Sequence, residues 1–282
     1  MVKSHPKKKI TLSPIHNTYF SGRLWMGLDF HKIKSFLQQL SPEIEVEIAE
    51  LYKVANDLSV LEEGSFLFFS SSYDNSYRKY ICDVVRYISQ VRPDIGLIPN
   101  YDMLLAHENK GYQELMKKIL AIEEPSGDYF GDLSDFDPSI HSRFPYVVKL
   151  LEGAMSSNVF LVESYKDLER KLKARRNKNL RYDLKRLLKN YVINRKYRVD
   201  ADGFSRRNYD EFFQTRTPFI IQDYVKELTH DYKVLVFGDK YYPLKRYVRD
   251  NDFRASGSGK FVYEPPSFAV LDYCRKIYDL LN

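Results

Sequence analysis

The sequence predicts an α/β (α+β) protein, in which a small N-terminal domain with a parallel sheet precedes a β-rich part of two subdomains. Apolar β-type segments alternate with helix-patterned segments over residues 23–105, which is typical of a parallel α/β domain. Further along, two β-type segments flank a loop of small residues at 153–158. A Gly238-Asp239 pair between two apolar segments is a hairpin signal. At 282 residues the chain is long enough for two or three packed subdomains.

The periodicity of the apolar residues predicts the strands and helices of the N-terminal domain. Residues 1–22 carry few periodic signals, and we expect a loosely held arm there. The expected strands are 24–30, 44–48, 66–69 and 95–98, and the expected helices are 31–40 and 77–91. A helix remains the alternative for 44–48. Serines 70–72 follow the strand at 66–69, where parallel sheets tend to bind ligands, although an ordinary polar loop is favoured.

The middle of the chain combines a candidate anion-binding loop with a strongly basic helix pattern. We expect a helix at 106–120, a polar loop at 127–142 and strands at 145–150 and 159–162. The small residues between those two strands let backbone N–H groups approach an anion. Residues 165–191 have a helical pattern and carry most of the excess positive charge, since 166–200 contains fourteen Lys/Arg against four Asp/Glu. A solvated helix face is favoured there over nucleic-acid binding, so nucleic acid is not an expected partner.

Residues 218–259 form the stretch on which the functional interpretation of the sequence depends most. Strands are expected at 219–222, 232–237 and 241–247, and an amphipathic helix at 267–281. Charged side chains recur on and between these strands, ahead of a Ser-Gly-Ser-Gly loop: Asp231, Lys233, Lys245, Arg246, Arg249 and Arg254. Several cations near a flexible, amide-rich loop suit a polyanion, most simply a phosphate chain.

Composition and cysteine usage narrow the class of protein. No apolar segment approaches the roughly 20 residues of a membrane helix, and no apolar signal region follows the basic N-terminus. Cys82 and Cys274 are far apart and match no metal-binding spacing. We therefore expect two reduced thiols in a cytoplasmic protein without a membrane span.

The motifs, taken together, resemble the nucleotide site of ATP-grasp enzymes. The segment FPYVVKLLEGAMSSNV is similar to the first half of that site, and QDYV, HDYKVLVFGDKYYPLKR and DFRASGSG are similar to the second half. The resemblance covers roughly residues 107–282, and the order and separation of the motifs fit. After the expected arm at 1–22, it implies a pre-ATP-grasp domain at 23–105 and ATP-grasp subdomains at 106–217 and 218–282, the second of them incomplete at its C-terminal end.

The resemblance also implies roles for individual residues. Lys110 and Lys149 would contact phosphates, and the loop with Gly153, Ser156 and Ser157 would cover them, with fewer glycines than the family usually has. Lys149 is supported independently, because a lysine among so many apolar neighbours needs an anionic partner. The remaining implied contacts are Gln222, Asp223, Tyr224 and Val225 with adenine, Asp231 with ribose, and Lys233, Arg246 and Arg254 with the phosphates or an acyl phosphate.

The activity that the resemblance implies is ATP-dependent ligation. ATP would phosphorylate a carboxylate substrate, and an amine acceptor would attack the acyl phosphate. The family usually holds Mg²⁺ on an Asp and a Glu-x-Asn after the last helix, and these ligands are not found in the 282 residues. Three functions therefore stay open: a carboxylate–amine ligase, acting on a cell-surface polysaccharide or a small metabolite, a kinase with the same fold, and a non-catalytic nucleotide or anion binder.

Overall fold

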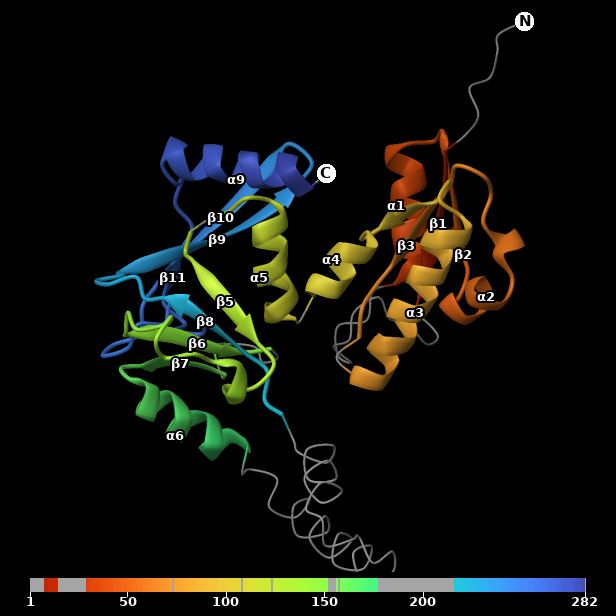
Figure 1. Cartoon of the computed structure of the whole chain (residues 1–282). Helices are drawn as coiled ribbons and strands as arrows, with labels where there is room; N and C mark the ends of the chain where they lie inside the picture. The colour runs from red at the N-terminus through yellow and green to blue at the C-terminus, as the bar shows by residue number, and fades with distance from the viewer. Residues whose placement is uncertain are drawn as a thin grey trace, which may run out of the picture. The chain divides into compact units, whose positions relative to one another are not determined.

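The computed structural model describes residues 8–14, 29–72, 74–107, 109–122, 124–151, 156, 158–176 and 216–281. The chain forms two compact units, Met1–His107 and Glu108–Asn282 (Figure 1).

The first unit is an α/β domain with a four-stranded parallel sheet in the order β2-β1-β3-β4. Its strands are β1 (Lys8–Ser13), β2 (Ile44–Ile48), β3 (Phe66–Phe69) and β4 (Gly96–Ile98). Its helices are α1 (Phe30–Leu40), α2 (Leu51–Asn56), the short 3₁₀ helix η1 (Leu58–Val60), α3 (Asn75–Val91) and α4 (Tyr101–Ala106). The predicted parallel α/β domain is confirmed.

Helices cover both faces of this sheet because successive side chains of a strand point to opposite sides. Leu12 and Phe68 pack with Phe30 of α1 on one face. Leu67 and Phe69 pack with α2, α3 and α4 on the other face. The two separate apolar clusters make the unit a three-layer domain.

The expectation of a loose arm at 1–22 is wrong for residues 8–13, because β1 is an inner strand between β2 and β3. Three neighbouring lysines hide the strand pattern, yet Lys9 is buried. Its ammonium lies 2.9 Å from Glu47 and 2.7 Å from Glu62, which supply the charge that a buried lysine requires. The strand expected at 24–30 fails at its end, because Phe30 begins α1 directly after the N-cap Asp29; residues 24–28 lie outside the described residues.

The second unit contains two antiparallel sheets. The first has the order β5-β8-β6-β7, with β5 (Gly127–Phe130), β6 (Tyr146–Leu150), β7 (Val159–Val162) and β8 (Phe219–Asp223). The second has the order β11-β10-β9, with β9 (His230–Phe237), β10 (Lys240–Tyr247) and β11 (Phe261–Val262). The helices are α5 (Lys110–Ile119), η2 (Leu133–Asp135), α6 (Tyr165–Arg176) and α9 (Phe268–Leu281).

The first of these sheets has an apolar face and a polar face. Phe219, Ile221 and Val148 pack with Leu168 and Leu172 of α6 in one buried cluster. The alternate residues of β6 and β8 point to the opposite face, where α5 packs against β5 and β8. That second face carries the polar side chains of the candidate site.

Two sequence-based expectations change in this unit. The loop expected at 127–142 begins with a strand, β5, which pairs with β8. The strand β8 was expected to open the second subdomain at 218, but it lies between β5 and β6 in the first sheet. The reason is its buried run of Phe219, Ile220 and Ile221, which is 0–2% exposed and fits an inner strand rather than a hairpin.

The second sheet and the last helix are less enclosed. The structure gives β9, β10 and α9 no fully buried residue. The expected hairpin at Gly238-Asp239 and the expected final helix are confirmed. None of the helices in the described ranges has the length and apolar character that a membrane span needs.

We predict that Leu12→Ala destabilises the N-terminal unit by about 2–5 kcal/mol, because Leu12 is 2% exposed in an inner strand and the substitution leaves a cavity. Urea unfolding followed by circular dichroism measures the loss. The matched control is Leu40→Ala, which removes a 74% exposed side chain and should cost less than about 0.5 kcal/mol. Equal, small effects of both substitutions would favour a loose arm.

Candidate functional site

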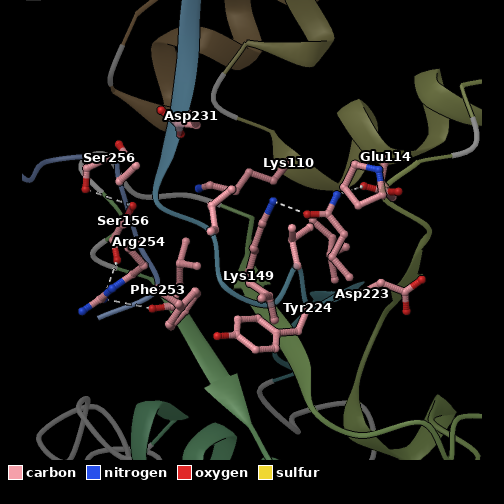
Figure 2. A pocket seen from close by; sticks show the side chains of 18 of the residues that line it. Lys110, Glu114, Lys149, Ser156, Asp223, Tyr224, Asp231, Phe253, Arg254 and Ser256 are labelled. Atoms are coloured by element: carbon pink, nitrogen blue, oxygen red, sulfur yellow. Dashed lines mark hydrogen bonds between the residues drawn. The ribbon is translucent and has the colours of Figure 1, made fainter. Parts of the chain in front are cut away.

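A cavity of about 460 Å³ lies among α5, β6, β8, β9 and the loop that follows β10 (Figure 2). Ionisable and amide side chains line it: Lys110, Gln113, Glu114, Lys117, Lys149, Gln222, Asp223, Asp231 and Arg254. Apolar residues also contribute: Val147, Val159, Ile220, Tyr224, Val225, Leu228 and Phe253. A pocket with an apolar wall and several converging cations suits a ligand with a flat apolar part and an anionic part.

Lys149 projects from β6 into the cavity, and its ammonium donates a hydrogen bond to the Gln222 side-chain oxygen on the neighbouring strand β8 (Figure 2). The Gln222 side-chain nitrogen donates in turn to Glu114 Oε2 at 3.0 Å. Glu114 Oε1 lies 2.7 Å from the ammonium of Lys117. The four side chains therefore form one hydrogen-bonded row across the polar face of the sheet.

Burial lowers the pKa of the Lys149 ammonium below its ordinary value. The Glu114 carboxylate opposes this effect on the pKa, whereas the cations of Lys117 and Lys110 add to it. The protein groups around Lys149 therefore do not fully compensate its charged form. An anion bound in the cavity would stabilise that form.

Lys110 and Lys117 bring two more ammonium groups to the cavity from α5. The Asn109 side chain caps this helix by accepting from the Tyr112 N–H at 3.1 Å. The Lys110 ammonium lies 3.4 Å from the Leu151 carbonyl oxygen, at the end of β6. Helix α5 thus begins beside the strand that carries Lys149, which brings both predicted lysines into one cavity.

The predicted covering loop is described in part. Ser156 lines the cavity with a φ of 59°, and its hydroxyl donates to the Ser256 carbonyl at 3.4 Å. Gly153 and Ser157 lie outside the described residues. The described part of this turn therefore contacts the loop that follows β10.

Arg254 lines the cavity, but its guanidinium is engaged within the protein. Its Nε donates to Asp252 at 2.9 Å, and its Nη1 donates to the carbonyls of Ser156 at 3.2 Å and Val159 at 3.1 Å. The hydrogen bond from Arg254 is the main cause that lowers the pKa of the Asp252 carboxyl. In this structure Arg254 fastens the turn after β6 to the loop after β10.

The end of β8 and the following residues form the apolar side of the cavity together with Phe253. The rings of Tyr224 and Phe253 meet edge to face, with centroids 6.1 Å apart. Val225 and Asp223 line the same cavity. The predicted QDYV segment is therefore brought together with Lys110, Lys149, Ser156, Asp231 and Arg254.

Two of the predicted site residues, Lys233 and Arg246, do not line the cavity. Lys233 is exposed on β9. Arg246 forms a two-pronged ion pair with Asp231, at 2.7 Å from Nε to Oδ1 and 2.8 Å from Nη2 to Oδ2. Asp231 does line the cavity, and both of its carboxylate oxygens accept hydrogen bonds from Arg246.

Sequence reasoning missed Glu114, Lys117, Phe253 and Ser256 as lining residues. Glu114 is 5% exposed, and a buried glutamate inside a charged helix has no distinguishing pattern. Its position four residues after Lys110 was the available signal, since residues four apart share one face of a helix.

Comparison with known proteins is informative at the level of the fold. No protein-family model matches the sequence, and no curated protein matches it. The structure is similar to that of D-cycloserine synthetase DcsG, with 13% identity over 97% of this chain and 80% of that chain and a TM-score of 0.50. A RimK domain ATP-grasp protein from Sphaerobacter thermophilus shows 9% identity over 97% of this chain and 82% of that chain, with a TM-score of 0.49.

The chain therefore has the fold of the ATP-grasp superfamily, as the resemblance in its sequence implies. Within the described residues, no group of three or more His, Cys, Asp or Glu side chains is placed to hold a metal ion. The cations and the apolar wall of the cavity fit a nucleotide, whereas the described residues that line it include no such cluster of metal ligands.

We predict that Arg254→Lys loosens the connection between the turn after β6 and the loop after β10. A lysine cannot replace both the carboxylate pairing and the two carbonyl contacts, and charge-assisted hydrogen bonds contribute about 1.5–3 kcal/mol each. Hydrogen exchange followed by mass spectrometry should show exchange about tenfold faster or more at 158–162 and 249–256. Arg275→Lys, which alters an exposed pair with Asp272 on α9, is the control. Unchanged exchange in Arg254→Lys would contradict the assigned role.

Proposed function

We propose that this chain is an ATP-dependent carboxylate–amine ligase of the ATP-grasp fold. The observation that carries the proposal is the Lys149 ammonium, which lies in a cavity with two further lysines and lacks full charge compensation. A phosphate chain supplies the missing negative charge. The apolar wall beside the lysines is suited to a base.

The proposed orientation of the nucleotide follows from the distribution of charge in the cavity. Lys110 and Lys149 would contact phosphates, with the turn that carries Ser156 above them. The 222–225 segment and Phe253 would contact adenine, and Asp231 would contact ribose. Arg254 would act by holding the turn in place. A role for Lys233 and Arg246 requires a substrate that extends beyond the cavity.

The proposed reaction moves the terminal phosphoryl group of ATP to a carboxylate oxygen, which gives ADP and an acyl phosphate. The amine of a second substrate then attacks the acyl carbon, inorganic phosphate leaves, and an amide forms. In this scheme the lysines of the cavity offset negative charge on the phosphates.

We predict that Lys149→Ala weakens ADP binding by about tenfold, or about 1.4 kcal/mol. The reason is the loss of one ammonium that compensates phosphate charge. Isothermal titration with ADP and with a non-hydrolysable ATP analogue, with and without magnesium, measures the change. Lys118→Ala is the matched control, because Lys118 lies on α5, pairs with Asp128 at 2.9 Å and does not line the cavity. Equal affinities for Lys149→Ala and the unaltered protein would overturn the assigned phosphate site.

We also predict that the chain converts ATP and a carboxylate to a trappable acyl phosphate. The test incubates the protein with ATP, magnesium, hydroxylamine and a panel of free amino acids. Hydroxamate and ADP should form together, because hydroxylamine attacks acyl phosphates and leaves phosphate esters intact. A stable phosphate ester would identify a kinase instead. ADP binding without any ATP turnover across the panel would favour a non-catalytic nucleotide binder.

A further inference from the structure

The buried carboxylate of Glu114 is an unexpected feature of a cavity proposed to hold phosphates. Its side chain is 6% exposed, and it lines the same cavity as Lys110, Lys117 and Lys149. A carboxylate at this position repels phosphate oxygens, so it weakens the binding of a polyanion unless it has another effect. Its hydrogen bonds indicate what that effect is.

The chain makes room for this carboxylate at Gly127. A Cβ atom at Gly127 would lie 2.5 Å from Glu114 Oε1 and 2.8 Å from its Cδ. Gly127 stands directly opposite Gln222 in the pairing of β5 with β8. The absence of a side chain on β5 thus lets the carboxylate reach the amide of Gln222 on the next strand.

Glu114 also determines the direction of the Gln222 amide. A carboxylate accepts hydrogen bonds and an ammonium donates them, so Gln222 must turn its NH₂ group toward Glu114 and its oxygen toward Lys149. If the amide reversed, two donors would face each other on one side and two acceptors on the other. The carboxylate therefore holds the acceptor that receives the Lys149 ammonium.

We infer that Glu114 is a positioning residue: acting through the Gln222 amide, it holds the Lys149 ammonium in place for the phosphates of a bound nucleotide. This inference rests on the proposed function of the cavity. Lys117 pairs with Glu114 Oε1 at 2.7 Å, the oxygen that does not accept from Gln222, and this pairing limits the repulsion between the carboxylate and phosphate.

The charged groups around Lys149 determine the pKa of its ammonium and thereby the pH at which it loses its charge. Lys110, Glu114 and Lys117 face it from α5, Gln222 is its neutral neighbour on β8, and Asp223, Asp231 and Arg254 line the rest of the cavity. Of the groups that act on the pKa of Lys149, Glu114 raises it, whereas burial and the two α5 lysines lower it. Removing the charge of Glu114 should therefore lower the pKa of Lys149.

The test uses Glu114→Gln, which keeps the shape of the side chain and removes its charge. Nuclear magnetic resonance of protein labelled with ¹³C at the lysine ε-carbon follows the titration of Lys149 without nucleotide, with the resonance assigned from Lys149→Arg. The Lys149 titration should move to lower pH in Glu114→Gln. Glu169→Gln, which alters a glutamate paired with Lys173 on α6, should leave it unchanged.

A second measurement examines nucleotide binding. The ADP affinity of Glu114→Gln should begin to decline at a lower pH than that of the unaltered protein. In a Lys149→Ala background, Glu114→Gln should change ADP affinity by less than about twofold, because the effect passes through Lys149. Gln222→Met, which breaks the hydrogen-bonded connection but keeps both charges, should weaken ADP binding in the presence of Lys149 and not in the Lys149→Ala background, and it serves if Glu114→Gln does not fold.

The outcomes separate the two proposals. If the folded, unaltered protein binds no ADP, the proposed nucleotide site fails, while the titration of Lys149 still decides whether Glu114 controls it. If ADP binds and Glu114→Gln leaves the Lys149 titration unchanged, the positioning role is overturned. An effect of Glu114→Gln on ADP affinity that is equally large with and without Lys149 would also overturn it.

Discussion

The Lys149 ammonium has to be held at the surface of a sheet whose opposite face is a packed apolar cluster. Removing an ammonium group from water is costly, and here the nearest partner on the adjacent strand is a neutral amide. The position of that amide depends on Glu114, and the position of Glu114 depends on Lys117 and on the missing side chain at Gly127. Helix α5 and three strands of the sheet are thus connected through one lysine.

The strands and loops around Lys149 also form the walls of the cavity. Strand β8 lies between β5 and β6, so the end of β8 brings Gln222, Tyr224 and Val225 beside Lys149. On the other side, Arg254 donates to the carbonyls of Ser156 and Val159, which brings Phe253 and Ser256 to the edge of the cavity. Cations therefore gather beside α5 and apolar groups beside Phe253, an arrangement that matches the two parts of a nucleotide.

Local pattern predicted most of the elements and part of the site. The apolar spacing of α1, α3 and α9 and the hairpin at Gly238 are properties of neighbouring residues, and sequence reasoning found them. The position of β1 was missed because the partners of Lys9 lie about forty and fifty residues away, at Glu47 and Glu62. The pairing of β8 depends on long-range contacts in the same way.

The site residues also differ in whether a local pattern or a long-range contact determines their role. Lys149 could be predicted because a recognisable motif surrounds it, and Lys110 because the family resemblance places a lysine beside the predicted helix. Glu114, in contrast, gains its role from a strand more than one hundred residues away. Arg254 was predicted to face phosphates, and the structure shows its donors on Asp252 and two carbonyls, which no local pattern specifies.

Photoaffinity labelling with 8-azido-ATP, followed by peptide mapping, tests the central claim most directly. The account predicts that the adenine-side probe attaches to residues within 220–228 or 253–256 and that excess ATP prevents the labelling. Labelling that maps to the N-terminal unit, or that excess ATP does not reduce, would contradict a nucleotide site in this cavity.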